Sequence, residues 1–221
     1  MKLIALSFGI LVVQLHLFGQ RTNDHMVPPT SYFENSCIGG DTCARAYYQV
    51  LDEVMVGRAS STPELLIVRM PIYEPESMYY TTEIDGKYYL VYTVMSHLVG
   101  AAKTGQRVNY VQHSIEISKR LKDRIANTFR KALLRTRYST KLATGEITVE
   151  YIVTLQDQQQ SPGVLNGVIR SPNFATPMDF LVRGIFLMGK AARGSKWHDL
   201  DQAPAITELE SQLTEIERRV N

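Results

Sequence analysis

The dipeptide Asp85-Gly86 constrains the fold more than any other feature, because two strand-like runs flank it directly. Residues 78–84 and 87–95 are rich in tyrosine, threonine and branched side chains, which favour β-strands. An Asp-Gly pair between two such runs is typical of a two-residue hairpin turn. The sequence therefore predicts two antiparallel strands joined at this turn.

The second of these strands has apolar side chains on both faces, which predicts a position inside a sheet. Side chains alternate along a strand, so one face is expected to carry Tyr88, Leu90, Tyr92 and Val94, and the other Tyr89, Val91, Thr93 and Met95. This region is rich in tyrosine, which favours β-strands, and we expect the aromatic face of the sheet to pack beneath a helix. An aromatic face that binds a glycan or a partner is the alternative. The tyrosines concerned are Tyr73, Tyr79, Tyr80, Tyr88, Tyr89 and Tyr92.

Three further segments have the length and composition of strands. They are residues 65–70, 146–155 and 164–170, and each is bounded by turn-forming residues or loops. The last of them is expected to pair back on the segment before it. With the hairpin, these segments predict an antiparallel sheet of about five strands.

Two helices are expected to cover this sheet, which makes the fold class α+β. One is amphipathic and predicted over residues 113–138, with apolar positions on one arc and basic positions mostly on the other. The other is predicted over residues 177–193 and is apolar nearly all round, so we expect it to be buried. Thr176 followed by Pro177 is typical of a helix start.

A last helix is predicted over residues 204–220, within a C-terminal segment 201–221. Its apolar residues recur at alternating spacings of three and four; they are Ile206, Leu209, Leu213, Ile216 and Val220. A seam this short seldom holds a coiled coil alone. We therefore expect this helix to dock on the domain formed by residues 37–200, and dimerisation through residues 204–220 is the alternative.

The N-terminus has the layout of a secretory signal peptide over residues 1–19. Lys2 precedes an apolar run from Leu3 to Val13 that only Ser7 interrupts, and Gly19 is the expected cleavage point. A membrane span needs about 20 apolar residues, so the run is too short, and no later run qualifies. The sequence predicts a periplasmic or secreted protein with an exposed leader over residues 20–36. A retained apolar helix or uncleaved anchor is the alternative.

The two cysteines, Cys37 and Cys43, agree with export. An even number of cysteines in an exported chain favours a disulfide. Their spacing is not Cys-x-x-Cys, and a zinc site needs further ligands, so a redox or metal role has little support. The predicted disulfide would staple the start of a helix expected over residues 44–56, and free thiols are the alternative.

The helix predicted over residues 113–138 is the main basic element. Residues 115–141 hold nine Lys or Arg and two acids, a net charge of +7, whereas the whole chain has only +2. An anionic envelope or extracellular ligand could bind there. A solvated face, or one paired with the protein's own acidic surface, is the alternative. Few aromatics interleave with the basic residues, which argues against a stacking platform for single-stranded nucleic acid, so nucleic acid is not the expected partner. The candidate anion-binding residues are Lys119, Arg120, Arg124, Arg130, Lys131 and Arg137.

The sequence contains no assembled catalytic, metal or cofactor motif. Lys103-Thr104 lacks the glycines of a phosphate loop, and the histidines do not have the spacing of a metal site. We therefore predict an exported, non-enzymatic binding or interaction protein without a cofactor. The alternative is a hydrolase whose site is assembled from residues distant in sequence, with His97 or His198 beside a carboxylate.

Overall fold

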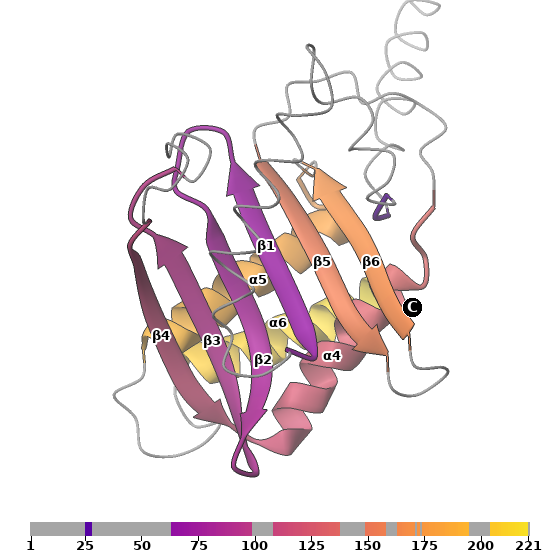
Figure 1. Ribbon diagram of the computed structural model, residues 1–221. Coiled ribbons are helices and arrows are strands. Elements are labelled where there is room, and N and C mark those ends of the chain that lie inside the picture. The colour runs from indigo at the N-terminus through magenta and orange to yellow at the C-terminus, as the bar shows by residue number, and fades with distance from the viewer. Residues whose placement is uncertain are drawn as a thin grey trace, which may run out of the picture.

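The computed structural model describes residues 25–27, 63–98, 108–137, 149–157, 163–170, 172, 174–194 and 204–220. They form a six-stranded antiparallel sheet and three helices, which confirms the predicted α+β class (Figure 1). The strands are β1 (Leu65–Pro71), β2 (Ser77–Ile84), β3 (Lys87–Met95), β4 (Tyr110–Ile117), β5 (Val149–Asp157) and β6 (Gly163–Arg170). Their order in the sheet is β4-β3-β2-β1-β5-β6. The helices are α4 (Lys119–Leu133), α5 (Pro177–Arg193) and α6 (Pro204–Val220).

The hairpin at Asp85-Gly86 is confirmed. Ile84 and Lys87 are opposite each other across the turn, and Asp85 and Gly86 have φ angles of 51° and 75°. Positive φ at both central residues is the geometry of the tight turn that Asp-Gly favours. Strand β3 lies between β2 and β4, so its predicted interior position is also confirmed, as is the pairing of β5 with β6.

The helix predicted over residues 113–138 is wrong at both ends. Residues 110–117 form β4 and pair with β3 along its length, and the helix extends only from Lys119 to Leu133. Ser118 separates the two elements, because its hydroxyl accepts a hydrogen bond from the backbone N–H of Leu121 at 3.1 Å and thereby caps the helix. Ile117 fits the strand alternation and the helical period equally, which explains the error. The sheet consequently has one strand more than expected.

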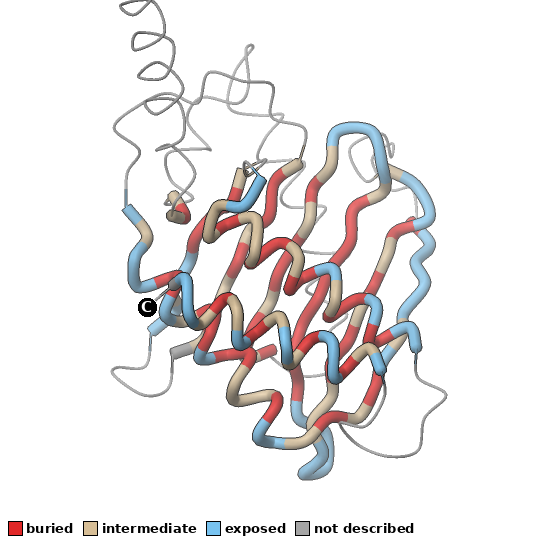
Figure 2. The backbone as a smooth tube through the Cα atoms, turned by 180° about the vertical axis from the view of Figure 1, so that it is seen from behind, coloured by how far each residue is buried: buried red, intermediate tan, exposed pale blue. Residues whose placement is uncertain are grey.

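All three described helices lie on one face of the sheet (Figures 1 and 2). Helix α5 begins as predicted, with Thr176 as its N-cap and Pro177 in its first turn. Its buried side chains pack over β2, β3 and β4, while Phe186 remains half-exposed. Where α5 passes over the sheet, Gly189 lies close to the rings of Tyr79 and Tyr92. These two tyrosines therefore lie beneath a helix, as expected.

Helix α6 docks on the domain, which confirms the expected packing. It packs against α5 and α4, and its seam residues from Ile206 to Ile216 have no accessible surface. Leucine and isoleucine side chains buried in this way are unavailable to a second copy of the chain. These contacts hold α6 against α4 and α5.

The opposite face of the sheet is also apolar, and no described helix lies on it. Val68, Met78, Tyr80, Val91 and Met95 form a second buried cluster on this face. Both faces of the sheet therefore contribute to the core, in agreement with the two apolar faces read from residues 87–95.

Residues 25–27 lie beside the β6 edge of the sheet. Val27 exchanges two backbone hydrogen bonds with Val168, at 3.0 and 2.8 Å. Met26 is fully buried and lies against Gly167, where a Cβ atom would come within 2.8 Å of the Met26 sulfur. At these residues the segment predicted as an exposed leader is therefore packed against the domain.

Several predictions concern residues outside those that the structure describes. They are the signal peptide at residues 1–19, the Cys37–Cys43 disulfide, the helix over residues 44–56, and the loops that hold Lys103-Thr104 and His198.

Candidate functional site

The basic face of α4 is largely joined to acidic side chains of the same protein. Arg120 contacts Glu210 at 2.7 Å, and Arg124 contacts Glu217 at 3.0 Å, so both arginines connect α4 to α6. Lys119 contacts Asp123 one turn further along α4, at 2.6 Å. Lys119, Arg120 and Arg124 are thus in ion pairs, as in the alternative in which the helix pairs with its own acidic surface.

Arg124 is at the centre of the strongest of these contacts. Its Nε and Nη2 atoms donate to the two oxygens of Glu217, each at 3.0 Å, and Nη2 also donates to Thr214 at 2.7 Å. The Arg124 guanidinium lowers the pKa of Glu217, and Glu217 raises the pKa of Arg124. A guanidinium held at two points has less freedom to bind an external anion.

The remaining candidates diverge in position. Arg130 lines a recess beneath α4, Lys131 is exposed on the helix, and Arg137 follows the helix as an exposed residue whose backbone N–H donates to Met26. The six residues therefore do not converge on one anion site. Only Lys119 and Arg130 reach the same recess, which we call the α4 pocket.

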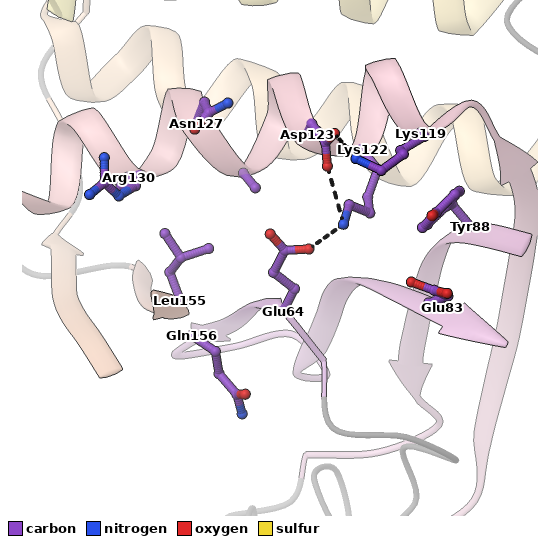
Figure 3. A pocket seen from close by; sticks show the side chains of 11 residues that line it. Glu64, Glu83, Tyr88, Lys119, Lys122, Asp123, Asn127, Arg130, Leu155 and Gln156 are labelled. Carbon is purple, nitrogen blue, oxygen red and sulfur yellow. Dashed lines mark hydrogen bonds and ion pairs between the residues drawn. The ribbon is translucent and has the colours of Figure 1, made fainter. Parts of the chain in front are cut away.

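The α4 pocket has a volume of about 380 Å³ and lies between α4 and one end of the sheet (Figure 3). Helix α4 contributes one wall. Glu64 directly precedes β1, Glu83 lies near the end of β2, Tyr88 lies near the start of β3, and the end of β5 completes the lining. The described lining residues are Glu64, Glu83, Tyr88, Lys119, Lys122, Asp123, Ala126, Asn127, Arg130, Leu155 and Gln156.

Lys122 holds the centre of this pocket. Its ammonium lies 2.6 Å from Glu64 and 3.2 Å from Asp123, and 5.1 Å from the centre of the Tyr88 ring, within the range of a cation–π contact. The side chain is only 12% exposed. Burial alone would lower the pKa of Lys122, but the hydrogen bonds and charges of Glu64 and Asp123 outweigh it and raise the pKa. Lys122 therefore stays protonated.

Both carboxylates around Lys122 contact its ammonium directly. Burial would raise the pKa of Asp123, yet hydrogen bonds from Lys119 and Lys122 lower it. Glu64 receives the shortest contact from Lys122, and its backbone C=O accepts from the N–H of Gln156 at 2.8 Å. This network fixes the start of β1, the end of β5 and the first turns of α4 relative to one another.

Three polar side chains of the pocket make no hydrogen bond or ion pair with any described residue. They are the carboxylate of Glu83 and the amides of Asn127 and Gln156, and they come from β2, α4 and β5. Together they offer amide donors, amide acceptors and a carboxylate. A polar ligand in the pocket could satisfy these groups without disturbing the Lys122 network.

The α4 pocket is balanced in charge. Lys119, Lys122 and Arg130 contribute three cations, and Glu64, Glu83 and Asp123 contribute three anions. A site of this kind lacks the net positive field that concentrates phosphate or sulfate groups. Its chemistry suits a neutral or zwitterionic polar molecule.

Sequence reasoning had little chance of finding this pocket. Tyr88 belongs to the tyrosine group singled out above, and Lys119 and Arg130 to the basic face, but Glu64, Asn127 and Gln156 carry no motif. They meet only because β1, α4 and β5 come together at one end of the sheet. Hydrophobic alternation locates the strands but leaves the polar residues at their ends unassigned.

The structure gives the described histidines no shared site. His97 is exposed in the turn after β3, and His113 stacks on Tyr92, with their ring centres 6.3 Å apart. None of the three described histidines, His25, His97 and His113, is among the pocket residues. Within the described ranges, no group of three His, Cys, Asp or Glu side chains is arranged to hold a metal ion.

Among the residues that the structure describes, no helix combines the length and the apolar composition that a membrane span requires. No family model, curated protein or solved structure matches the chain.

Proposed function

We propose that this chain is an exported, non-enzymatic binding protein and that the α4 pocket holds its ligand. One observation carries the proposal. The fixed ion-pair network around Lys122 lies beside polar side chains that form no hydrogen bond or ion pair with any described residue. The Lys122 network preorganises the site, and Glu83, Asn127 and Gln156 supply the contacts. Preorganised polar groups bind with little loss of conformational entropy.

The ligand proposed is small, polar and without net charge, such as a saccharide or a zwitterion. Equal numbers of cationic and anionic side chains line the pocket, and its volume lies near the lower end of the range of about 300 to 1,000 Å³ for small-molecule sites. The half-buried Tyr88 ring offers a flat apolar surface to the carbon skeleton of such a ligand. Anions would gain little there, because each one would also meet the three carboxylates.

Binding is favoured over hydrolysis by the state of the pocket carboxylates. A general acid needs a carboxyl group with a raised pKa, whereas the lysines lower the pKa of Asp123 and Lys122 directly contacts Glu64. The described lining also contains no histidine, cysteine or serine to act as base or nucleophile. These features support a site that binds its ligand unchanged.

Export is part of the proposal and rests on the first 19 residues. The single early charge, the short apolar run and Gly19 are typical of a cleaved signal. Mass spectrometry of the protein from its native envelope or medium tests this directly. A mature chain that begins after Gly19 is expected, and one that retains Met1 contradicts cleavage.

A thermal-shift screen tests the ligand proposal. The library contains neutral saccharides, amino acids and betaines, and small anions including inorganic phosphate. Compounds that raise the unfolding midpoint are expected among the neutral and zwitterionic groups. They should lose most of this effect in Asn127→Ala and Gln156→Ala, and keep it in Asn109→Ala, an exposed position next to β4 and outside the pocket lining.

Three results would contradict the proposal. One is a set of hits confined to anions, and another is the absence of any hit that the pocket variants weaken. The third is the appearance of cleavage products when a hit is incubated with the protein, which would favour the hydrolase alternative.

A further inference from the structure

The two edges of the sheet differ in how they are protected. At one edge, Val27 exchanges backbone hydrogen bonds with Val168 of β6 and the neighbouring Met26 is buried. At the other edge, β4 pairs with β3 and with no other described strand (Figure 1). An edge strand presents a row of backbone N–H and C=O groups that can accept another strand.

Strand β4 has few of the features by which proteins block such edges. Its register with β3 runs without interruption from Tyr110 to Ile117, so it contains no bulge, and its sequence contains neither proline nor lysine. Tyr110 and Val111 are 37% and 52% exposed. The one charged residue, Glu116, is joined to Lys87 of β3 at 3.1 Å. The edge is therefore long, regular and accessible.

An arginine that forms no ion pair with any described residue lies close to this edge. Arg193, at the end of α5, is exposed and lies over the ring of Tyr92, at 5.3 Å from its centre. Tyr92 is opposite His113 of β4, and the two rings stack. The Arg193 side chain donates to the backbone of Gly189, and it makes no ion pair with any described residue. A positive charge thus lies beside the centre of β4, on the helical side of the sheet.

We propose that the β4 edge binds an extended segment of a partner protein as an added antiparallel strand. Backbone hydrogen bonds would supply the affinity, and side chains at alternate positions the specificity, as in other cases of strand addition. The residue of the partner opposite His113 would point to the helical side of the sheet and toward Arg193. An acidic residue there would pair with the guanidinium.

Arg193 also argues against a second copy of the chain as the occupant. Antiparallel pairing of two β4 strands about their centre would be two-fold symmetric and would bring the Arg193 of each copy toward the same seam. Like charges across an interface disfavour association. A partner strand with a central acidic residue removes this conflict, and for that reason we assign the edge to a different protein.

A set of synthetic peptides tests the assignment by fluorescence anisotropy with the full purified protein. The first is an eight-residue peptide of alternating Thr and Val with a central Glu. The second has Lys in place of Glu. Two further Glu peptides are N-methylated at alternate backbone amides, one for each set of alternate positions. Strand addition uses only one of these sets, because successive N–H groups point to opposite sides of a strand.

The Glu peptide is expected to bind more tightly than the Lys peptide, and one methylated peptide should lose binding while the other keeps it. Arg193→Glu is expected to weaken the Glu peptide about fivefold, from the size of an exposed ion pair, and to strengthen the Lys peptide. Arg137→Glu is the matched control, since Arg137 is also exposed but its backbone N–H donates to Met26, near the β6 edge. It should leave both affinities unchanged.

Equal binding of the Glu and Lys peptides, equal effects of both methylation patterns, or no binding of any peptide would overturn the proposal. Sedimentation of the protein alone supplies an independent check. A monomer is expected, and a dimer that Val111→Lys dissociates would assign the edge to a second copy instead.

Discussion

Arg124 of α4 and Glu217 of α6 form a two-point ion pair, with two N–O distances of 3.0 Å. The two residues are 93 positions apart in the sequence, and each side chain is about three-quarters buried. Thr214 and Thr128 add hydrogen bonds to the same pair. This contact joins the C-terminal helix to the helix that walls the α4 pocket.

Substitution of Glu217 is expected to reveal a stability contribution that depends on pH. Arg124 lowers the pKa of Glu217 below its ordinary value of 4.5. A carboxylate with a lowered pKa stabilises the folded state fully above its unfolded pKa, and this contribution is lost as the pH falls through the folded pKa. Glu217→Gln should therefore lower the free energy of unfolding by about 1 kcal/mol at pH 7.

Urea titrations at several pH values measure this difference. It should stay constant from pH 8 to about pH 5.5 and shrink as the pH falls below about 4.5. Glu208→Gln is the matched control, because Glu208 pairs with Lys190 while both side chains are more than half exposed, and exposed pairs contribute little. A Glu217→Gln effect of equal size at pH 3 and pH 7 would contradict the role of the ion pair.

Removal of the acids on α6 is expected to expose the basic face of α4. Glu210 and Glu217 contact Arg120 and Arg124 in the folded protein. The double substitution Glu210→Gln with Glu217→Gln removes two negative charges and the carboxylates that contact both arginines in the described part of the chain. On a heparin column, the variant should elute at a higher salt concentration than the wild-type protein. If both proteins elute at the same salt concentration, then the contacts with α6 do not prevent these arginines from binding anions.

The fold was more predictable than the site because local signals define most of its elements. Asp85-Gly86 identified the hairpin, and Thr176-Pro177 identified the start of α5. The error at β4 arose because Ile117 satisfies strand alternation and also extends the helical period of α4. Pairing with β3 decides between the two, and a partner strand is not visible in a local window.

The α4 pocket depends on contacts that no local signal encodes. The sequence shows Lys122 only as part of a basic segment. Its position at the centre of the pocket depends on its contact with Glu64, which precedes it by 58 positions. Likewise, Arg120 and Arg124 were candidate anion-binding residues until the docking of α6 supplied their acids. Charge patterns predicted a basic face, and tertiary packing determined which charges remain available.

Truncation of Leu213 is expected to test the docked position of α6. Leu213 has no accessible surface in the single chain. Leu213→Ala should lower the free energy of unfolding by about 2 to 5 kcal/mol, from the lost burial and the cavity left behind, when measured by urea denaturation. The wild-type protein and the variant should both sediment as monomers. A concentration-dependent midpoint, or a wild-type dimer that the variant lacks, would instead support dimerisation through residues 204–220.

Gly189 is expected to be required where α5 crosses the sheet. A Cβ atom at this position would lie 2.8 Å from Cε1 of Tyr79 and 3.4 Å from the ring of Tyr92. Tyr79 has little room to move, because its side chain is only 3% exposed and burial raises its pKa to about 12. Gly189→Ala should therefore lower the free energy of unfolding by about 1 to 2 kcal/mol, since overpacking outweighs the better helix propensity of alanine.

Thermal unfolding of three single variants and one double variant separates this steric effect from a general effect of glycine replacement. Gly194→Ala is the matched control, because the nearest atoms to its Cβ would be backbone oxygens at 3.5 and 3.7 Å and its φ of −77° suits any residue. It should change stability by no more than about 0.5 kcal/mol. Tyr79→Leu removes the ring that Gly189→Ala meets, so the double variant should be more stable than the sum of the two single effects predicts. Strictly additive effects would place the strain of Gly189→Ala elsewhere than at Tyr79.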